Sequence, residues 1–317
     1  SRVFMSAEDK LDVLKGFLNL SHISRDECLF YCPHCEHHKP KMSVNLDKNV
    51  YKCWVCDAKG NNIWRLVRKF GDSSDKRKWR SFEDEVDITD SVYEKIFGTP
   101  KEEEETIELP QEFVSLTNRN LLVGGKRAKK YILNRGLTER DIARWKIGYC
   151  ASGEYKNRVI FPSFNKDGKL NYFVGRSHSD DWMKYKNPMV SRNIIFNELN
   201  VDWKERVCLV EGIFDAVKAG INSIPLLGST LSERSRLFQK ITENDTIVYL
   251  ALDPDADKKS MEMIKTFLAH GIEVHQVNVN GYEDVGSMSK EIFMRRFKQA
   301  RHITSEVYFH DTIRKIN

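Results

Sequence analysis

The chain contains 317 residues, a length typical of two domains with room for a small additional module. Its net charge is only +5, so charge by itself is a weak indication of a nucleic-acid partner. No run of 18 or more apolar residues occurs, and the N-terminus lacks the apolar stretch of a secretory signal. We therefore expect no membrane segment and a cytoplasmic location.

Four cysteines near the N-terminus form two Cys-x-x-Cys pairs. Cys32 and Cys35 make the first pair, and Cys53 and Cys56 make the second. Two residues between thiolates allow both to face one ion, and two such pairs complete a tetrahedral site that suits Zn²⁺. We predict one structural zinc ion in a zinc ribbon. The alternative is that a nearby histidine replaces one cysteine, and the candidates are His34, His37 and His38. The isolated Cys28, Cys150 and Cys208 are interpreted as ordinary core or surface thiols.

Residues 1–70 are predicted to form this zinc-binding domain. It begins with an amphipathic helix at 7–20. Two strands at 42–46 and 50–53 enclose a turn, and a second helix follows at 61–70. Residues 71–110 are highly charged and are predicted to be a linker.

The remaining chain is predicted to be a globular α/β unit, divided into a subdomain at 111–205 and a second one at 206–317. After residue 205, strands alternate with helices, which favours a mainly parallel sheet. The overall fold class is therefore α+β or α/β. Strands are expected at 157–164, 170–175, 206–211, 223–227, 245–252 and 272–279, and helices at 213–220, 231–240, 258–270 and 288–300.

Acidic residues follow three of these strands. Glu211 and Asp215 come after the first, Asp253 and Asp255 after the second, and Asp284 after the third. The carboxyl ends of parallel strands are where α/β sheets place their sites. Clustered carboxylates repel one another, and hard cations such as Mg²⁺ or Mn²⁺ relieve that repulsion. We predict two or more such ions, an arrangement that suits phosphoryl transfer.

These motifs together resemble those of DnaG-type DNA primases from bacteria and bacteriophages, along nearly the whole chain. In the zinc module the resemblance rests on Cys32-Pro33, Lys39-Pro40 and residues 51–56. Two departures are visible: Cys35 stands where bacterial members usually carry His, and Pro254 where many carry Gly. In the second domain the matching segments are 135–138, 147–149, 157–162, 184–188, Glu211-Gly212 with Asp215, and Asp253 with Asp255.

The resemblance implies a zinc ribbon followed by an RNA polymerase domain of the Toprim fold, which makes short RNA primers on single-stranded DNA from NTPs. Glu211, Asp253 and Asp255 would be catalytic and would bind Mg²⁺ or Mn²⁺, assisted by Asp215 and Asp284. No P-loop motif is present, so basic side chains are expected to hold phosphates. A separate replicative helicase is an expected partner, and the compact length fits a phage origin. The nucleotide- and template-binding candidates are Asn157, Arg158, Arg176 and Lys184.

Basic and aromatic residues are interleaved in the zinc module. Such a mixture suits single-stranded DNA, because rings stack on bases while cations follow the phosphates. Trp64 has helical spacing and could equally belong to the core. The candidates for DNA contact are Lys39, Lys41, Tyr51, Trp54 and Arg65.

Two other functions fit part of this pattern. Another Toprim enzyme, a nuclease or a topoisomerase-like protein, would share the acidic motifs, and ribonucleotide incorporation separates it from a primase. A non-catalytic zinc-ribbon DNA-binding protein would keep DNA affinity when Asp253 is changed to Asn, but would have no activity to lose.

Overall fold

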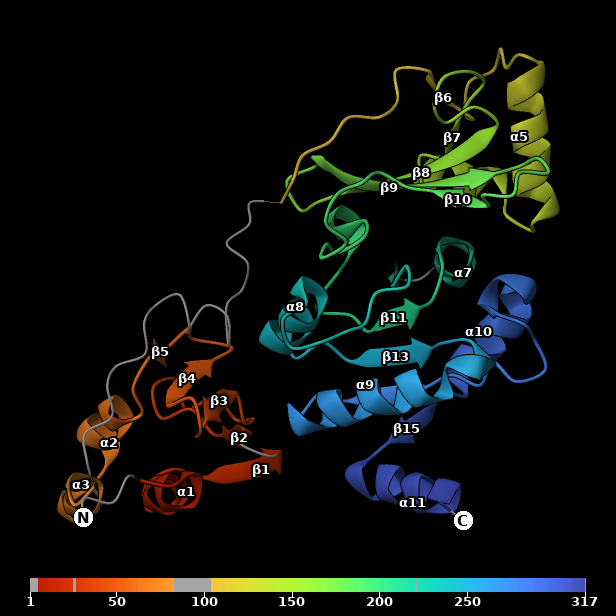
Figure 1. Ribbon diagram of the computed structural model, residues 1–317. Helices are drawn as coiled ribbons and strands as arrows, with labels where there is room; N and C mark the ends of the chain where they lie inside the picture. The colour runs from red at the N-terminus through yellow and green to blue at the C-terminus, as the bar shows by residue number, and fades with distance from the viewer. Residues whose placement is uncertain (1–4, 25–26, 83–103, 221, 317) are drawn as a thin grey trace.

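The computed structural model describes residues 5–24, 27–82, 104–220 and 222–316. These residues form three five-stranded sheets, which follow one another along the chain (Figure 1). None of the described helices is long and apolar enough to span a bilayer. The mixed α/β class predicted from the sequence is confirmed.

The N-terminal module is an antiparallel sheet flanked by three helices. Ser6 and Asp9 form a capping box at the start of α1, and the helix ends before Gly16, earlier than predicted. Apolar side chains from the helices and the sheet share one core, which includes Leu14, Phe30 and Leu66. The elements are α1 (Ala7–Lys15), β1 (Leu20–Ser24), β2 (Glu27–Phe30), β3 (Met42–Asn45), β4 (Val50–Cys53), β5 (Lys59–Gly60), α2 (Trp64–Phe70) and α3 (Ser73–Arg80).

Helix α3 lies inside the range 71–110, which we predicted to be a charged linker. Asp72 caps this helix through the backbone N–H groups of Ser74 and Asp75, and Trp79 is buried in the module's core. At the other end of the range, the Ile107 N–H donates to the Leu170 carbonyl in the second sheet. Both described ends of the predicted linker are therefore folded, and residues 83–103 lie outside the described residues.

The second sheet is antiparallel, in the order β10-β9-β8-β7-β6, and carries two helices. The predicted strands at 157–164 and 170–175 are its two longest. Its elements are β6 (Phe113–Ser115), α5 (Val123–Asn134), α6 (Glu139–Arg144), β7 (Gly148–Cys150), β8 (Arg158–Phe164), β9 (Leu170–Ser177) and β10 (Tyr185–Lys186).

The third sheet has the order β12-β11-β13-β14-β15. The first four strands are parallel and β15 is antiparallel, so the predicted mainly parallel sheet is confirmed. Its elements are β11 (Val207–Val210), α7 (Ile213–Ala219), β12 (Ser223–Pro225), α8 (Arg236–Asn244), β13 (Val248–Ala251), α9 (Asp257–Ala269), β14 (Val274–Gln276), α10 (Lys290–Lys298), β15 (Arg301–Ile303) and α11 (Ser305–Ile316).

Alternate residues of β11 face two different cores. Val207 and Leu209 pack under α8 and α9, whereas Cys208 and Val210 face a core that also contains Phe161 of the second sheet. The second and third sheets therefore share one hydrophobic core. This joint core fixes the carboxyl end of β11 relative to the second sheet.

The N-terminal module also packs against the third sheet's helices, through Lys41. The Lys41 side chain is fully buried, and its Nζ lies 2.7 Å from Asp245 Oδ1. It also donates to the carbonyls of Thr242 and His270, at 3.0 and 3.4 Å. In Figure 1 the module lies beside the ends of α8 and α9 that carry these carbonyls.

Candidate active site and zinc centre

The four cysteines of the two Cys-x-x-Cys pairs converge after β2 and β4. The Sγ atoms of Cys32 and Cys56 are 3.8 Å apart, and those of Cys35 and Cys53 are 3.9 Å apart. All four Sγ atoms lie within 4.8 Å of one another. A tetrahedral site with Zn–S bonds of about 2.3 Å places its sulfurs about 3.8 Å apart. The donor set and its spacing therefore fit the predicted structural zinc ion.

The neighbouring histidines have other contacts. His34 packs edge-on against Phe70, and His37 Nε2 lies 3.1 Å from Asp245 Oδ2. Because the four cysteines complete the site, the alternative with a histidine ligand is not supported. The isolated Cys28, Cys150 and Cys208 are buried and form no disulfide with any described residue.

The five predicted acidic residues form one cluster at the carboxyl ends of β11 and β13. Burial is the main reason that the pKa of Asp253 rises to about 7, and repulsion from the other four carboxylates adds to it. Asp253 Oδ1 is buried and has no hydrogen-bond partner among the described residues. An unpartnered buried carboxylate oxygen among four like charges is the donor that a hard cation would satisfy. The other members are Glu211, Asp215, Asp255 and Asp284.

Asp215 differs from the other four carboxylates, because both of its oxygens accept hydrogen bonds from backbone N–H groups. Oδ2 accepts from the Gly212 N–H at 2.8 Å, and Oδ1 accepts from the Gly286 N–H at 2.7 Å. Its carboxylate is buried, which is the main reason that its pKa rises to about 6. Asp215 thereby ties the loop after Glu211 to the turn that begins at Asp284.

Lys259, which the sequence analysis did not single out, supplies a cation to the cluster. Its Nζ lies 2.9 Å from Glu211 Oε2. The carboxylates of the acidic cluster are more widely spaced than the cysteines. Within the described residues, the cluster is not among the groups whose ligand atoms all lie within 4.8 Å of one another. Mutual repulsion and the pairing of Glu211 with Lys259 account for this wider spacing.

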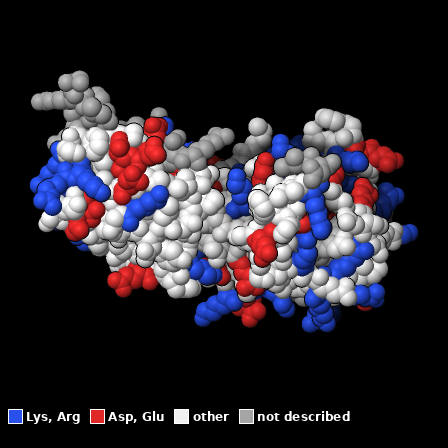
Figure 2. Space-filling view, turned by 90° about the horizontal axis from the view of Figure 1, so that it is seen from below, with Lys and Arg blue, Asp and Glu red and all other residues white. Residues whose placement is uncertain are grey.

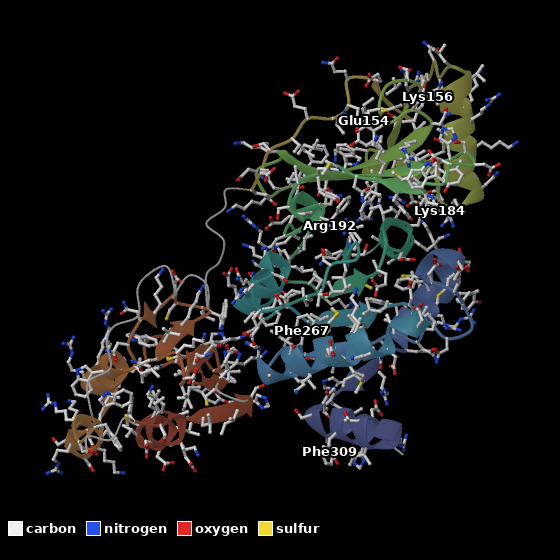
Figure 3. The ribbon with its side chains drawn as sticks, viewed as in Figure 1. Glu154, Lys156, Lys184, Arg192, Phe267 and Phe309 are labelled. Atoms are coloured by element: carbon white, nitrogen blue, oxygen red, sulfur yellow. The ribbon has the colours of Figure 1, made fainter. Side chains whose placement is uncertain are left out.

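Arg158 is buried rather than open to a ligand. Its guanidinium donates to Asp181 Oδ2 at 2.9 Å and to the carbonyls of Met183 and Lys184 at 2.8 and 3.2 Å. Arg158 therefore fixes the segment that carries Lys184, whose side chain is exposed. Figure 3 shows Lys184 on the side of the second sheet that faces α7 and α10. Asn157 is exposed, and its backbone adopts the left-handed conformation with φ of 57°.

Two further cations lie near the acidic cluster. Arg176 donates from Nε to the Tyr131 hydroxyl at 3.2 Å, and its guanidinium lies 4.7 Å from the centre of the Tyr185 ring. Arg135, which the sequence analysis did not assign to the site, lies over the Phe214 ring at 4.2 Å. Burial raises the pKa of Tyr185, and the charges of Arg176, Arg135 and Asp215 all act on it. Tyr185 therefore lies within electrostatic reach of both the basic residues and Asp215.

Three of the five predicted DNA-contacting residues of the zinc module are buried. Lys41 faces the third sheet's helices, Trp54 donates from Nε1 to Ser43 Oγ at 2.8 Å, and the Tyr51 ring packs against Gly60. Lys39 is half-buried and Arg65 is exposed. In this arrangement Lys41, Tyr51 and Trp54 support the structure of the module and its docking, which differs from the predicted role.

Helices α2 and α3 instead present a group of accessible cations. The rings of Trp64 and Trp79 stack between the two helices, and the Arg80 guanidinium covers Trp64 at 5.2 Å. Figure 2 shows Lys and Arg gathered at the end of the molecule formed by this module. We call this surface the α2–α3 basic face; its exposed cations are Arg65, Arg68, Lys69, Arg77, Lys78 and Arg80.

Comparison with known proteins supports the zinc centre and extends along most of the chain. Residues 4–93 match the family model described as CHC2 zinc finger. The chain is 26% identical to a DNA primase of Clostridium acetobutylicum, over 92% of this chain and 57% of the relative. It is 22% identical to a DNA primase of Staphylococcus epidermidis, over 86% of this chain and 54% of the relative. The chain thus spans just over half the length of these curated relatives.

The similarity extends to a solved structure described as the DnaG primase catalytic domain bound to ssDNA. It has 21% sequence identity and a TM-score of 0.51, over 63% of this chain and 77% of that one. The fold is therefore an N-terminal zinc-binding domain of the CHC2 type followed by a mixed α/β core of the primase catalytic type.

Proposed function

We propose that this chain is a DNA primase, a nucleotidyltransferase that synthesises short RNA primers on single-stranded DNA. The observation that carries the proposal is the convergence of five carboxylates at the strand ends of a core with the primase catalytic fold. Sequence similarity to primases along most of the chain supports it.

Glu211, Asp253 and Asp255 are the residues that would hold the catalytic Mg²⁺ or Mn²⁺ ions. Such ions would assist attack of a ribonucleotide 3′-hydroxyl on the α-phosphate of an NTP and stabilise the pyrophosphate that leaves. Parallel pairing of β11 and β13, with Val210 opposite Ala251, brings Glu211 and Asp253 to the same sheet edge. Asp215 positions the loops on which Glu211 and Asp284 lie.

Lys259 would act as a stand-in cation on Glu211 until a divalent ion binds. Lys259 lies in the first turn of α9, and its amine is at the end of a long side chain. The amine can therefore move away from Glu211 without any change in the sheet. Its charge would limit repulsion within the cluster in the absence of ions.

Arg135, Arg176 and Lys184 are proposed to bind the phosphates of the NTP and template. Arginine suits this role because its planar guanidinium matches phosphate oxygens. Arg158 would act indirectly, by fixing the segment that carries Lys184. Asn157 is kept as a candidate because it is exposed next to this segment.

The α2–α3 basic face and Lys39 are proposed to bind the template strand outside the catalytic cluster. Cations that follow phosphates bind single strands with little sequence preference. A contribution from Lys41 would require displacement of the module from the core, whereas Tyr51 and Trp54 are buried against residues of the module itself. A separate replicative helicase, a bacteriophage source and a cytoplasmic location stay predictions of the sequence analysis.

The test is primer synthesis on single-stranded DNA of mixed sequence with labelled NTPs and Mg²⁺. We expect short RNA from the parent protein and a loss of at least 100-fold in Asp253→Asn, with DNA binding retained. Glu306→Gln, an exposed change on α11, is the matched control and should leave synthesis unchanged. The absence of RNA on every template, with Mn²⁺ and the cognate helicase also supplied, would refute the proposal. DNA cleavage or relaxation in the same reactions would identify another Toprim activity instead.

A further inference from the structure

Two histidines and a glutamate form a cluster on the outer strands of the third sheet, separate from the acidic cluster. His275 of β14 and His302 of β15 are direct cross-strand partners, with ring centres 4.8 Å apart and planes 19° apart. Glu273 lies two residues before His275 and therefore on the same face. His275 Nε2 is 2.7 Å from Glu273 Oε1, and the three ligand atoms all lie within 4.8 Å of one another.

We propose that Glu273, His275 and His302 bind a further metal ion, a divalent transition metal such as Zn²⁺. Imidazole suits Zn²⁺, Ni²⁺ and Cu²⁺, whereas Mg²⁺ prefers oxygen ligands, so this site and the acidic cluster would select different ions. In a tetrahedral site with bonds of about 2.0–2.1 Å, neighbouring ligands lie about 3.3 Å apart. The hydrogen-bonded Glu273–His275 pair would need to open by only about half an ångström. Glu273 and His302 are exposed, so their side chains can rotate to complete the set.

The central ligand is already held in one orientation by aromatic stacking. The Tyr249 ring lies 4.6 Å from the His275 ring with planes 5° apart, and Phe297 of α10 covers the other face of Tyr249 at 4.4 Å. The side chain of His275 is only 16% exposed. A metal-binding histidine with a fixed ring loses less freedom on binding, and its outward nitrogen stays aimed at the partner ligands.

A third group, His37, His38 and Asp245, has similar spacing but is less suited to a metal. Lys41 Nζ lies 2.7 Å from Asp245 and Lys39 Nζ lies 3.6 Å from it, so cations already neutralise the only carboxylate. The Glu273–His275–His302 cluster is therefore the stronger candidate.

The ion would link the short edge strand β15 to its neighbour β14. Strand β15 pairs with β14 over only three residues and leads into α11. Arg301, next to His302, points to the opposite face and lines a cavity of about 560 Å³ that Asp253 also lines. Metal bound to His302 would thus restrain a wall of the cavity beside the acidic cluster. This consequence concerns the proposed active site, but the metal site itself does not depend on that function.

The experiment starts from protein that holds one zinc ion per chain in the cysteine site, free of other metals. Titration with Zn²⁺ against a chromogenic indicator is expected to reveal a second, weaker equivalent. His302→Asn should weaken that equivalent by roughly 100-fold, and Glu273→Gln by roughly tenfold. The control variant His310→Asn, an exposed histidine on α11, should titrate like the parent.

A second readout follows the strand directly. Saturating Zn²⁺ should slow amide hydrogen exchange of residues 301–303 in the parent and in His310→Asn, but not in His302→Asn. Absence of a second equivalent up to millimolar Zn²⁺ would overturn the proposal. So would a second equivalent that persists in the His275→Asn/His302→Asn double variant or disappears in His37→Asn/His38→Asn. None of these readouts depends on primer synthesis.

Discussion

Lys41 is predicted to hold the zinc-binding module on the core, and Lys41→Met tests this. Methionine keeps most of the apolar stem but removes the charge that faces Asp245 and two carbonyls. Loss of one partner of a buried ion pair costs about 3–5 kcal/mol. Asp245 is 19% exposed and retains Lys39 and His37 at 3.6 and 3.1 Å, which lowers the expected cost. We therefore expect about 2–3 kcal/mol, discounted from the fully buried case.

This free energy belongs to docking, because Asp245 and the carbonyls of Thr242 and His270, which hold the Lys41 amine, all lie on the core. Docking should weaken by about 30- to 150-fold, since 1.4 kcal/mol corresponds to a factor of ten. Hydrogen exchange followed by mass spectrometry, at residues 242–246 and 268–272, measures this. Lys39→Met is the matched control: its amine is farther from Asp245 and partly exposed, so we expect less than about 0.5 kcal/mol.

The double variant Lys41→Met/Asp245→Asn should exchange little faster than Lys41→Met, because the two changes remove one interaction. The reasoning would be refuted if Lys41→Met exchanged no faster than Lys39→Met at these segments. It would also be refuted if exchange rose equally throughout residues 5–82, which would indicate unfolding of the module rather than release.

Four further predictions concern the zinc site, His270, Lys259 and the basic face. Chelation of zinc, or Cys53→Ser, should unfold the N-terminal module, while residues 111–316 outside the docking segments 242–246 and 268–272 keep their amide protection, as hydrogen exchange would show. Burial lowers the pKa of His270 to about 4, so its contribution to stability is complete above about pH 6.5 and is lost as the pH falls toward 4. The free energy of unfolding in urea should fall by roughly 2–3 kcal/mol more between pH 7.5 and 4.5 in the parent than in His270→Gln. Lys259→Met removes the cation that competes for Glu211, and calorimetric titration should show Mg²⁺ binding three- to tenfold tighter; unchanged affinity would contradict this role. Arg77→Glu/Lys78→Glu should weaken single-stranded DNA binding and reduce the slope of log K against log salt by about 1.4, measured by fluorescence anisotropy.

The zinc site and the acidic cluster could be predicted because each depends on short-range pattern. Two residues between cysteines fix a tight turn, so Cys32 and Cys35 must face nearly the same point wherever the module folds. Likewise, Glu211 and Asp253 each follow a strand of four apolar or aromatic residues, and parallel pairing brings such ends together.

Other features depend on contacts between distant segments, which no local pattern reveals. Lys41 looks like a surface cation in a basic segment, and its burial depends on Asp245, which lies in another domain. Helix α3 could not be predicted because its sequence resembles a charged linker. Five of its eight residues are ionisable, and Trp79 is its one large apolar side chain. Arg158 and Lys184 were both expected to bind nucleotide or template, but the three hydrogen bonds of Arg158 to residues 181–184 could not be read from the strand that carries it.

The docked module meets the core at two places: at Lys41, which is far from the carboxylates, and at Trp54, which is closer to them. Lys41 contacts the C-terminal ends of α8 and α9, which lead into β13 and β14, whereas the carboxylates follow β11 and β13, at the other edge of the sheet. Trp54, however, borders a groove along α9 that Arg234 and Lys259 also line. Because Lys259 pairs with Glu211, this groove leads from the module to the acidic cluster. Under the proposed function, this groove would give a template strand a path to the carboxylates while Lys41 stays buried, and Glu27, Glu233 and Glu262, which also line the groove, would oppose its phosphates.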